Sequence, residues 1–520
     1  MLPLSFNTPL YYAAADMLWI HGTNLGQARK VREDAWRAEF KEAMDILFPV
    51  SMGGDPRKLW TCFPGPTVFN KSEGEFPIHV VDAEGKEPVL IPGLDLLNHN
   101  PSSHVAWIWD LNACTIKTDE VVCGGCEVPN NYGSKSNEEL IMGYGFSLPD
   151  NPADHFSIGF SPAVAANINL TRENRLRQKQ RMQNDALKCL DLGKFEDIDI
   201  HWVRIRKNQL EFSARLLEDV SIAVENPRER KNADLDLRLN LELLKTPLSR
   251  NKLHVLCALI MIMQKAQTSI SKFSPDLPKF PQNSRQADAA RYRQTQLTII
   301  DYALGTLISI LSSLFQNRAD CQEGARIARL EDILTDSPAK LKKDLRSVLN
   351  AGLKTRDPAK VRERGGTDFA MTVWLCGFMI YCRPYKDESE QALELESPFN
   401  RKCLLWLRLL IQEYPKESKD ARFEKASGAD LEDDKAKWLD PVRNSISLGD
   451  RFEETISTIA SYMDAIKVCV DKHPQSLYND PELDPKQLEW CYRVVRHEGV
   501  WIPNLFNSEG DDEWVLLLQD

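Results

Sequence analysis

The sequence predicts an α+β protein in which a compact β region is followed by a long helical region. Short apolar runs separated by turn residues indicate strands between residues 88 and 132. Apolar residues recur at three- and four-residue spacing in residues 10–48 and again after about residue 160, which indicates helices. These patterns divide the chain into residues 1–87, 88–158 and 159–520.

The first part begins with a helical pattern and ends in an irregular stretch. Ala14 and Leu18, and later Trp36 and Phe40, follow helical spacing and predict helix over residues 10–48. Proline and glycine are more frequent between residues 55 and 87, which predicts loops there. In the second part, residues 89–91, 105–109, 113–118 and 121–122 are strand candidates.

The third part has the pattern of long helices. Leu210, Leu217, Val220 and Val224 lie on one helical face, and Pro227 is expected to end that helix. Near-perfect helical spacing continues for about six turns after residue 289. Further helices are expected near residues 251–264, 339–353, 370–383, 398–413, 451–470 and 485–498. The proline-rich residues 271–284 are expected to form a loop, and the highly charged residues 416–437 to be exposed or disordered.

Composition and charge favour a soluble protein without broad nucleic-acid or membrane binding. The 520 residues carry a net charge of -11, which disfavours binding to nucleic acid or to anionic membranes. The first residues lack the basic and apolar regions of a signal peptide. The apolar residues 297–315 contain Asp301 and several hydroxyl side chains, which argues against a membrane-spanning helix.

The 12 cysteines are scattered, and several lie in apolar helical runs, as Cys257 and Cys376 do. This distribution predicts buried, reduced thiols and therefore a cytoplasmic or nuclear location. One close pair, Cys123 and Cys126 around two glycines, has the spacing of a zinc knuckle or a redox dithiol. Because no second such pair accompanies it, a glycine turn between two strands is favoured and no metal site is predicted.

Two short signatures carry the main functional indication. The first reads Leu-Ile-Pro-Gly-Leu-Asp-Leu-Leu-Asn-His over residues 90–99. The second reads Glu-Val-Pro-Asn-Asn-Tyr-Gly over residues 127–133 and continues through Ser-Asn-Glu-Glu-Leu at 136–140 to Gly-Tyr-Gly-Phe at 143–146. Alone, the first would be a capped turn, and the tyrosines would be a strand end or core aromatics. Their occurrence together and in this order is much more specific than either signature.

Together the signatures resemble the C-terminal half of the SET domain, in the subfamily typified by the Rubisco large-subunit lysine methyltransferase. The resemblance implies a partial SET β-fold at residues 88–158, with residues 1–87 as its helical insert. Residues 159–520 would then be a mostly helical domain similar to the substrate-binding domain of that subfamily. Residues 4–10 and 21–25 resemble the start of that helical insert, and residues 212–228 and 293–297 are weaker matches to the same subfamily.

The resemblance also implies a cofactor, a partner and a set of functional residues. It implies S-adenosylmethionine as methyl donor and a protein substrate, with lysine favoured over histidine as the acceptor. Asn98 and His99 would contact the cofactor, and Phe146 would pack against its adenine. Tyr132 would be the catalytic tyrosine and Tyr144 a second aromatic side chain of the channel for the amine. Such transfer requires the donor and a neutral amine to be aligned within about 3 to 3.5 Å.

The sequence departs from the subfamily pattern in two places. The Gly-x-Gly strand turn that normally precedes the helical insert has no counterpart here, and residues 60–69 lack the arginine expected before the Asn-His pair. Asp95 would support the Asn-His turn.

Three hypotheses follow: an active methyltransferase, a non-catalytic interaction scaffold derived from a SET domain, or an incomplete chain of an active enzyme. Unpaired strand edges would also predict low solubility or a stabilising partner.

Overall fold

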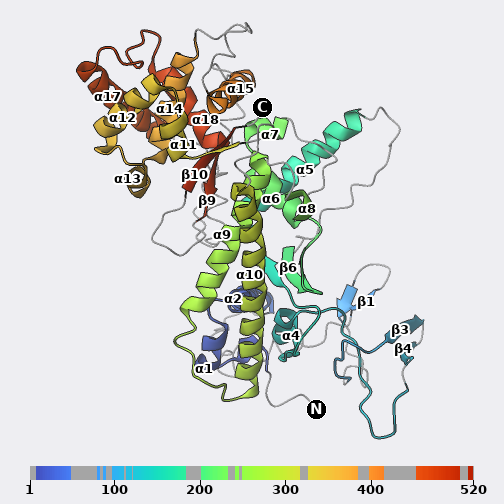
Figure 1. Cartoon of the computed structure of the whole chain (residues 1–520). Helices are drawn as coiled ribbons and strands as arrows, with labels where there is room; N and C mark the ends of the chain where they lie inside the picture. Colours follow the sequence, from blue (N-terminus) through green and yellow to red (C-terminus); the bar gives the residue numbers. More distant parts are fainter. Residues whose placement is uncertain are drawn as a thin grey trace. The chain divides into compact units, whose positions relative to one another are not determined.

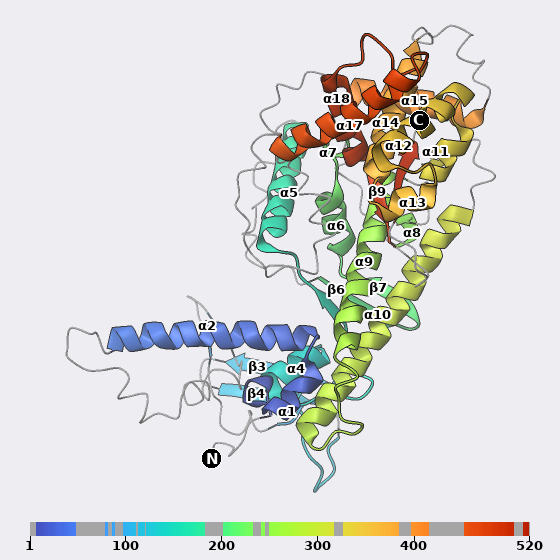
Figure 2. The ribbon, with the colours of Figure 1, turned by 90° about the vertical axis from the view of Figure 1, so that its left-hand side faces the viewer.

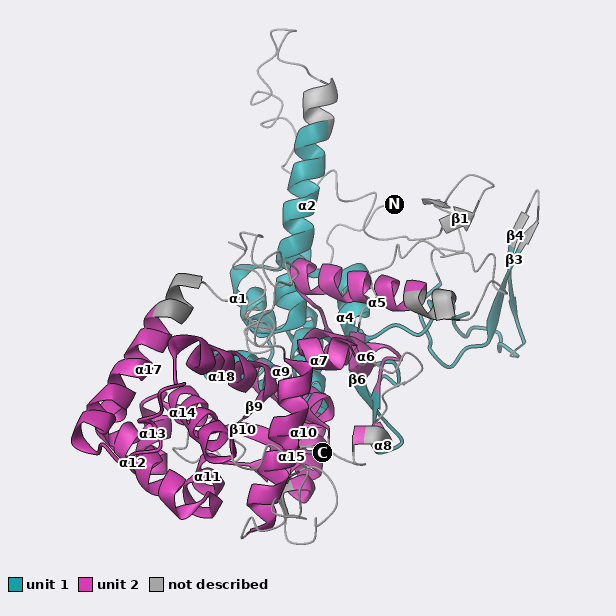
Figure 3. Cartoon of the chain, turned by 90° about the horizontal axis from the view of Figure 1, so that it is seen from above, with its two compact units in different colours: residues 1–157, 203–211, 266–301 teal, residues 158–202, 212–265, 302–520 magenta. Residues whose placement is uncertain are grey.

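The structure is a computed structural model, and it describes residues 7–47, 79–81, 86–88, 97–110, 113–119, 121–182, 201–231, 241–244, 249–316, 326–383, 397–414, 452–503 and 513–518 (Figure 1). The chain forms two compact units. Unit 1 comprises residues 1–157, 203–211 and 266–301, and unit 2 comprises residues 158–202, 212–265 and 302–520 (Figure 3). Each unit is therefore assembled from segments that are distant in the sequence.

One long helix, several short helices and two hairpins lie in the N-terminal segment of unit 1. The elements are η1 (Pro9–Tyr11), α1 (Ala14–Met17), η2 (Leu18–Ile20), α2 (Asn24–Leu47), β1 (His79–Val81), β2 (Lys86–Pro88), β3 (Val105–Asp110), β4 (Ala113–Thr118), α4 (Asn137–Tyr144) and β5 (Phe156–Ile158). Strands β1 and β2 pair antiparallel, as do β3 and β4, in which Val105 faces Thr118. Strands β3 and β4 match the predicted strands, whereas residues 89–91 lie outside the described residues.

The helical pattern of residues 10–48 is interrupted at Gly22. Gly22 has a φ of 75°, and a Cβ atom there would lie 2.3 Å from the backbone oxygen of Ser269. Thr23 then begins α2, since its hydroxyl donates to the Ile20 carbonyl at 2.6 Å and accepts from the Gly26 backbone nitrogen at 3.4 Å. One continuous helix over this segment is therefore wrong, because only glycine tolerates this backbone and this close approach.

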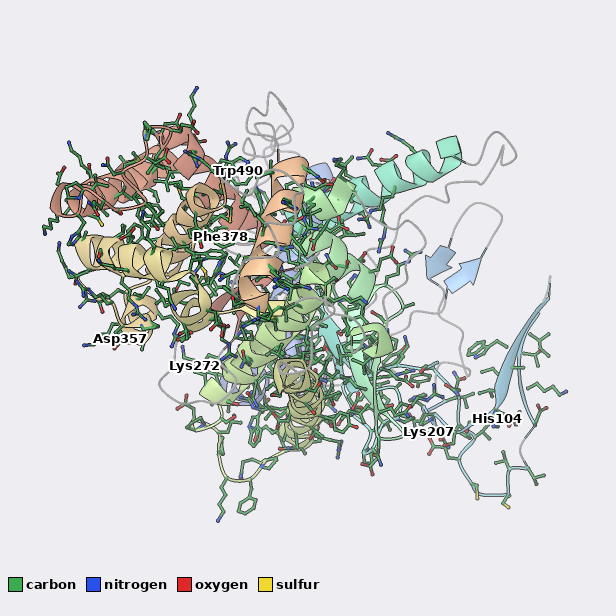
Figure 4. All side chains as sticks on the ribbon, turned by 45° about the horizontal axis from the view of Figure 1, so that its top comes forward. His104, Lys207, Lys272, Asp357, Phe378 and Trp490 are labelled. Carbon is green, nitrogen blue, oxygen red and sulfur yellow. The ribbon has the colours of Figure 1, made fainter. Side chains whose placement is uncertain are left out.

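The strand expected at residues 121–122 is absent, since both residues have irregular backbone. Val121 is 95% exposed, so its apolar side chain is not buried against a sheet. The helix expected from residue 210 begins later, because Gln209–Phe212 forms strand β7 beside β6 (His201–Arg206). Lys207, marked in Figure 4, and Asn208 both have positive φ (49° and 58°), as the turn of a two-residue hairpin requires.

Helices predominate in the rest of the chain. They are α5 (Pro162–Met182), α6 (Leu216–Val224), α7 (Pro227–Lys231), α8 (Leu241–Leu244), α9 (Arg250–Lys272), α10 (Ser284–Gln316), α11 (Leu330–Asp336), α12 (Ala339–Leu353), α13 (Pro358–Glu363), α14 (Thr367–Tyr381), α15 (Pro398–Glu413), α17 (Phe452–Lys472) and α18 (Pro485–Glu498). Pro227 starts α7 and does not merely end α6. The other predicted helices correspond to α9, α10, α12, α14, α15, α17 and α18, and residues 416–437 lie outside the described residues.

Three strands that the sequence did not predict lie in unit 2. They are β8 (Arg326–Ala328), β9 (Gly499–Ile502) and β10 (Glu513–Leu518). Strand β10 is central and pairs antiparallel with both of the others. A further three-stranded sheet has the order β5-β6-β7.

Unit 2 has an extensive apolar core. Trp374 of α14 stacks on Phe378 and on Trp406, with ring centroids 5.6 and 6.5 Å apart, and Figure 4 marks Phe378 and Trp490 among these helices. The indole nitrogen of Trp374 donates to the Ser337 hydroxyl at 3.0 Å, so this buried polar atom has a partner. Packing of large side chains therefore holds the helices of unit 2 together.

Two described helices are long and apolar enough to cross a membrane on length and composition alone. They are α9, Arg250–Lys272, and residues Ser284–Leu314 of α10, which lie side by side in Figures 1 and 2. Of their most apolar windows, 61% and 39% of the residues are buried inside the fold. Core helices of water-soluble proteins reach the same length and hydropathy.

Candidate functional site

The two signatures are joined by backbone hydrogen bonds in unit 1. His99 and Asn130 form a parallel β-bridge. The backbone nitrogen of Asn130 donates to the Asn98 carbonyl, and that of Asn100 donates to the Asn130 carbonyl, both at 2.8 Å. Residues 90–96, including Asp95, lie outside the described residues. Segments separated by about thirty residues therefore meet, as the resemblance requires.

The side chains of His99 and Tyr132 strengthen this junction. The backbone nitrogen of Tyr132 donates to His99 Nδ1 at 3.1 Å. The hydroxyl of Tyr132 donates to the Leu97 carbonyl oxygen at 2.7 Å. Tyr132 is consequently held at its backbone nitrogen and at its hydroxyl, and both hydrogen bonds run to the first signature.

Four of the five predicted site residues form one aromatic cluster. The His99 and Tyr132 rings are stacked with centroids 5.0 Å apart, and the Tyr132 and Tyr144 rings with centroids 4.7 Å apart. Phe146 completes the cluster at 6.4 Å from His99 and 6.3 Å from Tyr144. All four side chains are partly exposed, so the cluster reaches the surface of unit 1.

Asn98, the fifth predicted residue, is exposed and lies beside the cluster in the chain. Its side-chain amide donates to the carboxylate of Glu127, the first residue of the second signature. Asn131 of the second signature adds two hydrogen bonds to the segment that follows the first signature. Its amide donates to the carbonyls of Pro101 (3.3 Å) and Ser103 (3.0 Å). Sequence reasoning assigned no role to Glu127 or Asn131, although both lie within the second signature.

The surroundings of the cluster determine its protonation. Burial, followed by the positive charge of Lys135, lowers the pKa of His99 below its ordinary value of 6.5, although the Asn130 carbonyl opposes this. The neutral imidazole can therefore accept from Tyr132 through Nδ1 and carries its proton on Nε2. Burial, with Tyr132 and Glu139 nearby, raises the pKa of Tyr144 to about 12, so this hydroxyl stays protonated at neutral pH.

Helix α4 presents Tyr144 and Phe146 at its C-terminal end. Ser136 caps the helix: its hydroxyl accepts from the Glu139 backbone nitrogen, and the Glu139 carboxylate accepts from the Ser136 backbone nitrogen. Gly145 ends the helix with a φ of 78°, in the left-handed region. The Ser-Asn-Glu-Glu-Leu segment is thus a helix start, and the glycine between the two aromatic residues sets where their side chains point.

The N-terminal half of α10 holds α4 and the segment that follows the second signature. The Tyr292 hydroxyl donates to the Glu138 carboxylate at 2.7 Å, and the Asp288 carboxylate accepts from the Ser147 backbone nitrogen at 3.0 Å. One turn further along the helix, the Gln296 amide donates to the His155 carbonyl at 3.0 Å. The three α10 residues are spaced four apart and therefore share one helix face. The sequence shows this spacing but does not indicate which segment the face contacts.

Among the side chains that join α4 to α10, Glu138 has a strongly raised pKa. Burial raises the pKa of its carboxyl group to about 7, although the hydrogen bond from Tyr292 opposes the rise. The negative charge of Asp154 also raises the pKa of Glu138. Burial raises the pKa of the Asp154 carboxyl group itself to about 6. We therefore expect the attachment of α4 to α10 to depend on pH near neutrality.

No protein-family model matches the chain. Ribosomal lysine N-methyltransferase set10 of Schizosaccharomyces pombe is 27% identical over 303 residues, which cover 58% of this chain and 52% of that protein. Ribosomal lysine N-methyltransferase 1 of Saccharomyces cerevisiae is 41% identical over 70 residues, covering 14% of this chain and 12% of that protein. A solved structure of Rubisco LSMT bound to AdoMet is 16% identical with a TM-score of 0.43, covering 61% of this chain and 70% of that one.

The alignments with these curated relatives support the resemblance to SET-domain lysine methyltransferases. The chain spans about half the length of the S. pombe relative. The structural likeness is too weak to add to the argument, so the resemblance rests on sequence similarity and on the joined signatures.

Proposed function

We propose that this protein transfers a methyl group from S-adenosylmethionine to a lysine side chain of a protein substrate. The observation that carries the proposal is the junction of the two signatures, at which His99 accepts from the Tyr132 backbone and Tyr132 donates to Leu97. The similarity to lysine methyltransferases over 303 residues supports the same reaction.

The residues of the junction suit the cofactor in chemical type. Asn98 offers an exposed amide, and the partly exposed rings of His99 and Phe146 offer surfaces on which an adenine can stack. We assign these three residues to cofactor binding. S-adenosylmethionine, when bound, supplies a methyl group activated by its sulfonium charge.

We assign Tyr132 and Tyr144 to the acceptor amine. A lysine must lose its proton before it can attack, and an aromatic enclosure favours the neutral amine because it removes water from the ammonium. The Tyr132 hydroxyl donates a hydrogen bond to the Leu97 carbonyl, and we propose that its oxygen accepts a hydrogen bond from the amine of the substrate. The Tyr144 hydroxyl stays protonated because its pKa is raised to about 12.

The substrate is proposed to be a basic protein held by the helical residues 159–520. The names of the two relatives make ribosomal proteins the first candidates. A net charge of -11 favours encounter with such basic partners. Buried, unpaired cysteines such as Cys257, Cys376 and Cys403 support a cytoplasmic or nuclear location.

Two measurements test the proposal. The purified chain should bind S-adenosylmethionine in a calorimetric titration and transfer labelled methyl groups to ribosomal proteins. Tyr132→Phe should lower the transfer rate by about 100-fold through loss of the positioned hydroxyl, whereas Tyr302→Phe, at an exposed position of α10, should not. Absence of cofactor binding would remove the catalytic proposal and favour the non-catalytic scaffold.

A further inference from the structure

The loop between β4 and the second signature contains a pair of exposed thiols that the proposed reaction does not use. Cys123 and Cys126 are both free and exposed, whereas the other cysteines whose environment the structure describes are buried. Residues 121–128 are exposed, and a Cβ atom at Gly124 or Gly125 would meet nothing within 4 Å. The pair is therefore accessible to small reagents.

The backbone already holds the two cysteines at a suitable separation. The Cys126 nitrogen donates to the Cys123 carbonyl at 3.0 Å, which closes a four-residue turn. Gly125, the third residue of the turn, has a φ of 87°, as a type II turn requires at that position. The Cα atoms at the two ends of such a turn lie less than about 7 Å apart. That limit includes the separations of about 4.4 to 6.8 Å that disulfides span.

Dithiol chemistry suits the pair better than metal binding does. Within the described residues, no group of three or more His, Cys, Asp or Glu side chains is placed to hold a metal ion. Two thiolates alone leave a tetrahedral zinc site half complete. A disulfide needs only the two sulfur atoms and a turn that brings them together.

We propose that Cys123 and Cys126 are a redox-modification site that forms a reversible intramolecular disulfide. The oxidant is a low-molecular-weight disulfide such as oxidised glutathione. One thiolate attacks a sulfur of the oxidant, which breaks the S–S bond and releases the first reduced thiol. The second thiolate then attacks the mixed disulfide and releases the second reduced thiol, and these leaving groups take up the two protons lost by the cysteines.

The disulfide is directly connected to the candidate site. Glu127 follows Cys126 in the chain and accepts from the amide of Asn98, and Asn130 pairs with the first signature three residues further on. Oxidation restrains the turn and hence the backbone leading into these contacts. Amide hydrogen exchange in residues 121–132 should therefore slow after oxidation, and unchanged exchange would overturn this coupling.

The modification can be measured on one peptide. Trypsin cleavage after Lys117 and Lys135 releases residues 118–135, which contain Cys123 and Cys126 and no other cysteine. After equilibration of the full chain with oxidised and reduced glutathione, alkylation should leave this peptide unlabelled and lighter by two hydrogen atoms. Labelling of both thiols, or a glutathione on each, would overturn the proposal. Cys123→Ser should convert the product to a mixed disulfide at Cys126.

Two neighbouring glycines provide a matched test of the turn. Gly125→Ala keeps both thiols but places a side chain at positive φ, and should shift the equilibrium about fivefold to thirtyfold towards the dithiol. Gly124→Ala, where φ is not positive and a Cβ meets nothing, should leave the equilibrium unchanged. Equal behaviour of the two variants would show that the turn does not prepare the disulfide. None of these measurements depends on methyltransferase activity.

Discussion

The joined signatures of unit 1 and the helical core of unit 2 are held together by different forces. Around Tyr132 the contacts are directional hydrogen bonds to backbone atoms, and the nearby buried apolar cluster is small. In unit 2, large side chains such as Trp374, Phe378 and Trp406 pack in a continuous core. The difference teaches that stability and the placement of functional groups are provided separately, because packing is not directional whereas hydrogen bonds are.

The largest effect is expected from a cavity in unit 2. Leu410 of α15 is fully buried, and Leu410→Ala should lower the free energy of unfolding of unit 2 by about 2 to 5 kcal/mol. Leu405→Ala in the same helix, at a side chain that is 47% exposed, should cost less than about 0.5 kcal/mol. Chemical denaturation measures both changes in stability. Loss of cofactor binding in the Leu410 variant would contradict the conclusion that stability and the placement of functional groups are provided separately.

A smaller loss is expected at Gly145, between the two aromatic residues of the site. Gly145→Ala combines positive φ with a Cβ atom 2.8 Å from the backbone of Asn7, and should cost about 2 to 4 kcal/mol. Gly143→Ala in α4 meets nothing within 4 Å and should be neutral or slightly stabilising. If the two variants unfold alike, the site does not depend on the backbone at Gly145.

The third prediction concerns pH. Because the pKa of Glu138 is raised from 4.5 to about 7 in the folded unit, the folded state binds the proton more tightly than the unfolded state. The stabilisation is complete below about pH 4.5 and is lost as the pH rises to about 7, with a slope of at most about 1.4 kcal/mol per pH unit. Hydrogen exchange of the α4 amides as a function of pH measures it.

Glu138→Gln should flatten this profile, since the amide oxygen still accepts from Tyr292 but no longer titrates. Part of the slope should remain, because the pKa of Asp154 is also raised, to about 6. The exposed Glu39→Gln in α2 is the control and should leave the profile unchanged. A profile in the Glu138 variant as steep as in the parent would contradict the buried-carboxyl interpretation.

The smallest effect is expected at the start of α4. Ser136→Ala removes the cap that accepts from the Glu139 backbone nitrogen and should cost about 1 kcal/mol. Ser136→Thr should retain most of the stability, and Ser134→Ala, at an exposed position before the helix, should have little effect. Thermal unfolding of unit 1 distinguishes them, and equal losses at Ser134 and Ser136 would remove the capping argument.

The long helices and one hairpin followed from local patterns. The spacing of apolar residues in α10 and α14, and the short apolar runs of β3 and β4, depend on side chains that are near in the chain. The helix expected across Gly22 and the strand expected at Val121 were wrong for the opposite reason. Whether Gly22 breaks a helix depends on the approach of Ser269, and whether Val121 forms a strand depends on a partner, and neither is a local property.

The sequence by itself determined which residues the candidate site contains, because Asn98, His99, Tyr132, Tyr144 and Phe146 were recognisable as parts of two ordered signatures. Only the tertiary structure decided that His99 and Tyr132 stack and that Glu127 accepts from Asn98. It also decided that Tyr292 of α10 donates to Glu138 of the second signature. Hydrogen bonds and ring contacts between segments separated by dozens of residues form only once the chain has folded, since packing of the whole unit brings their partners within reach.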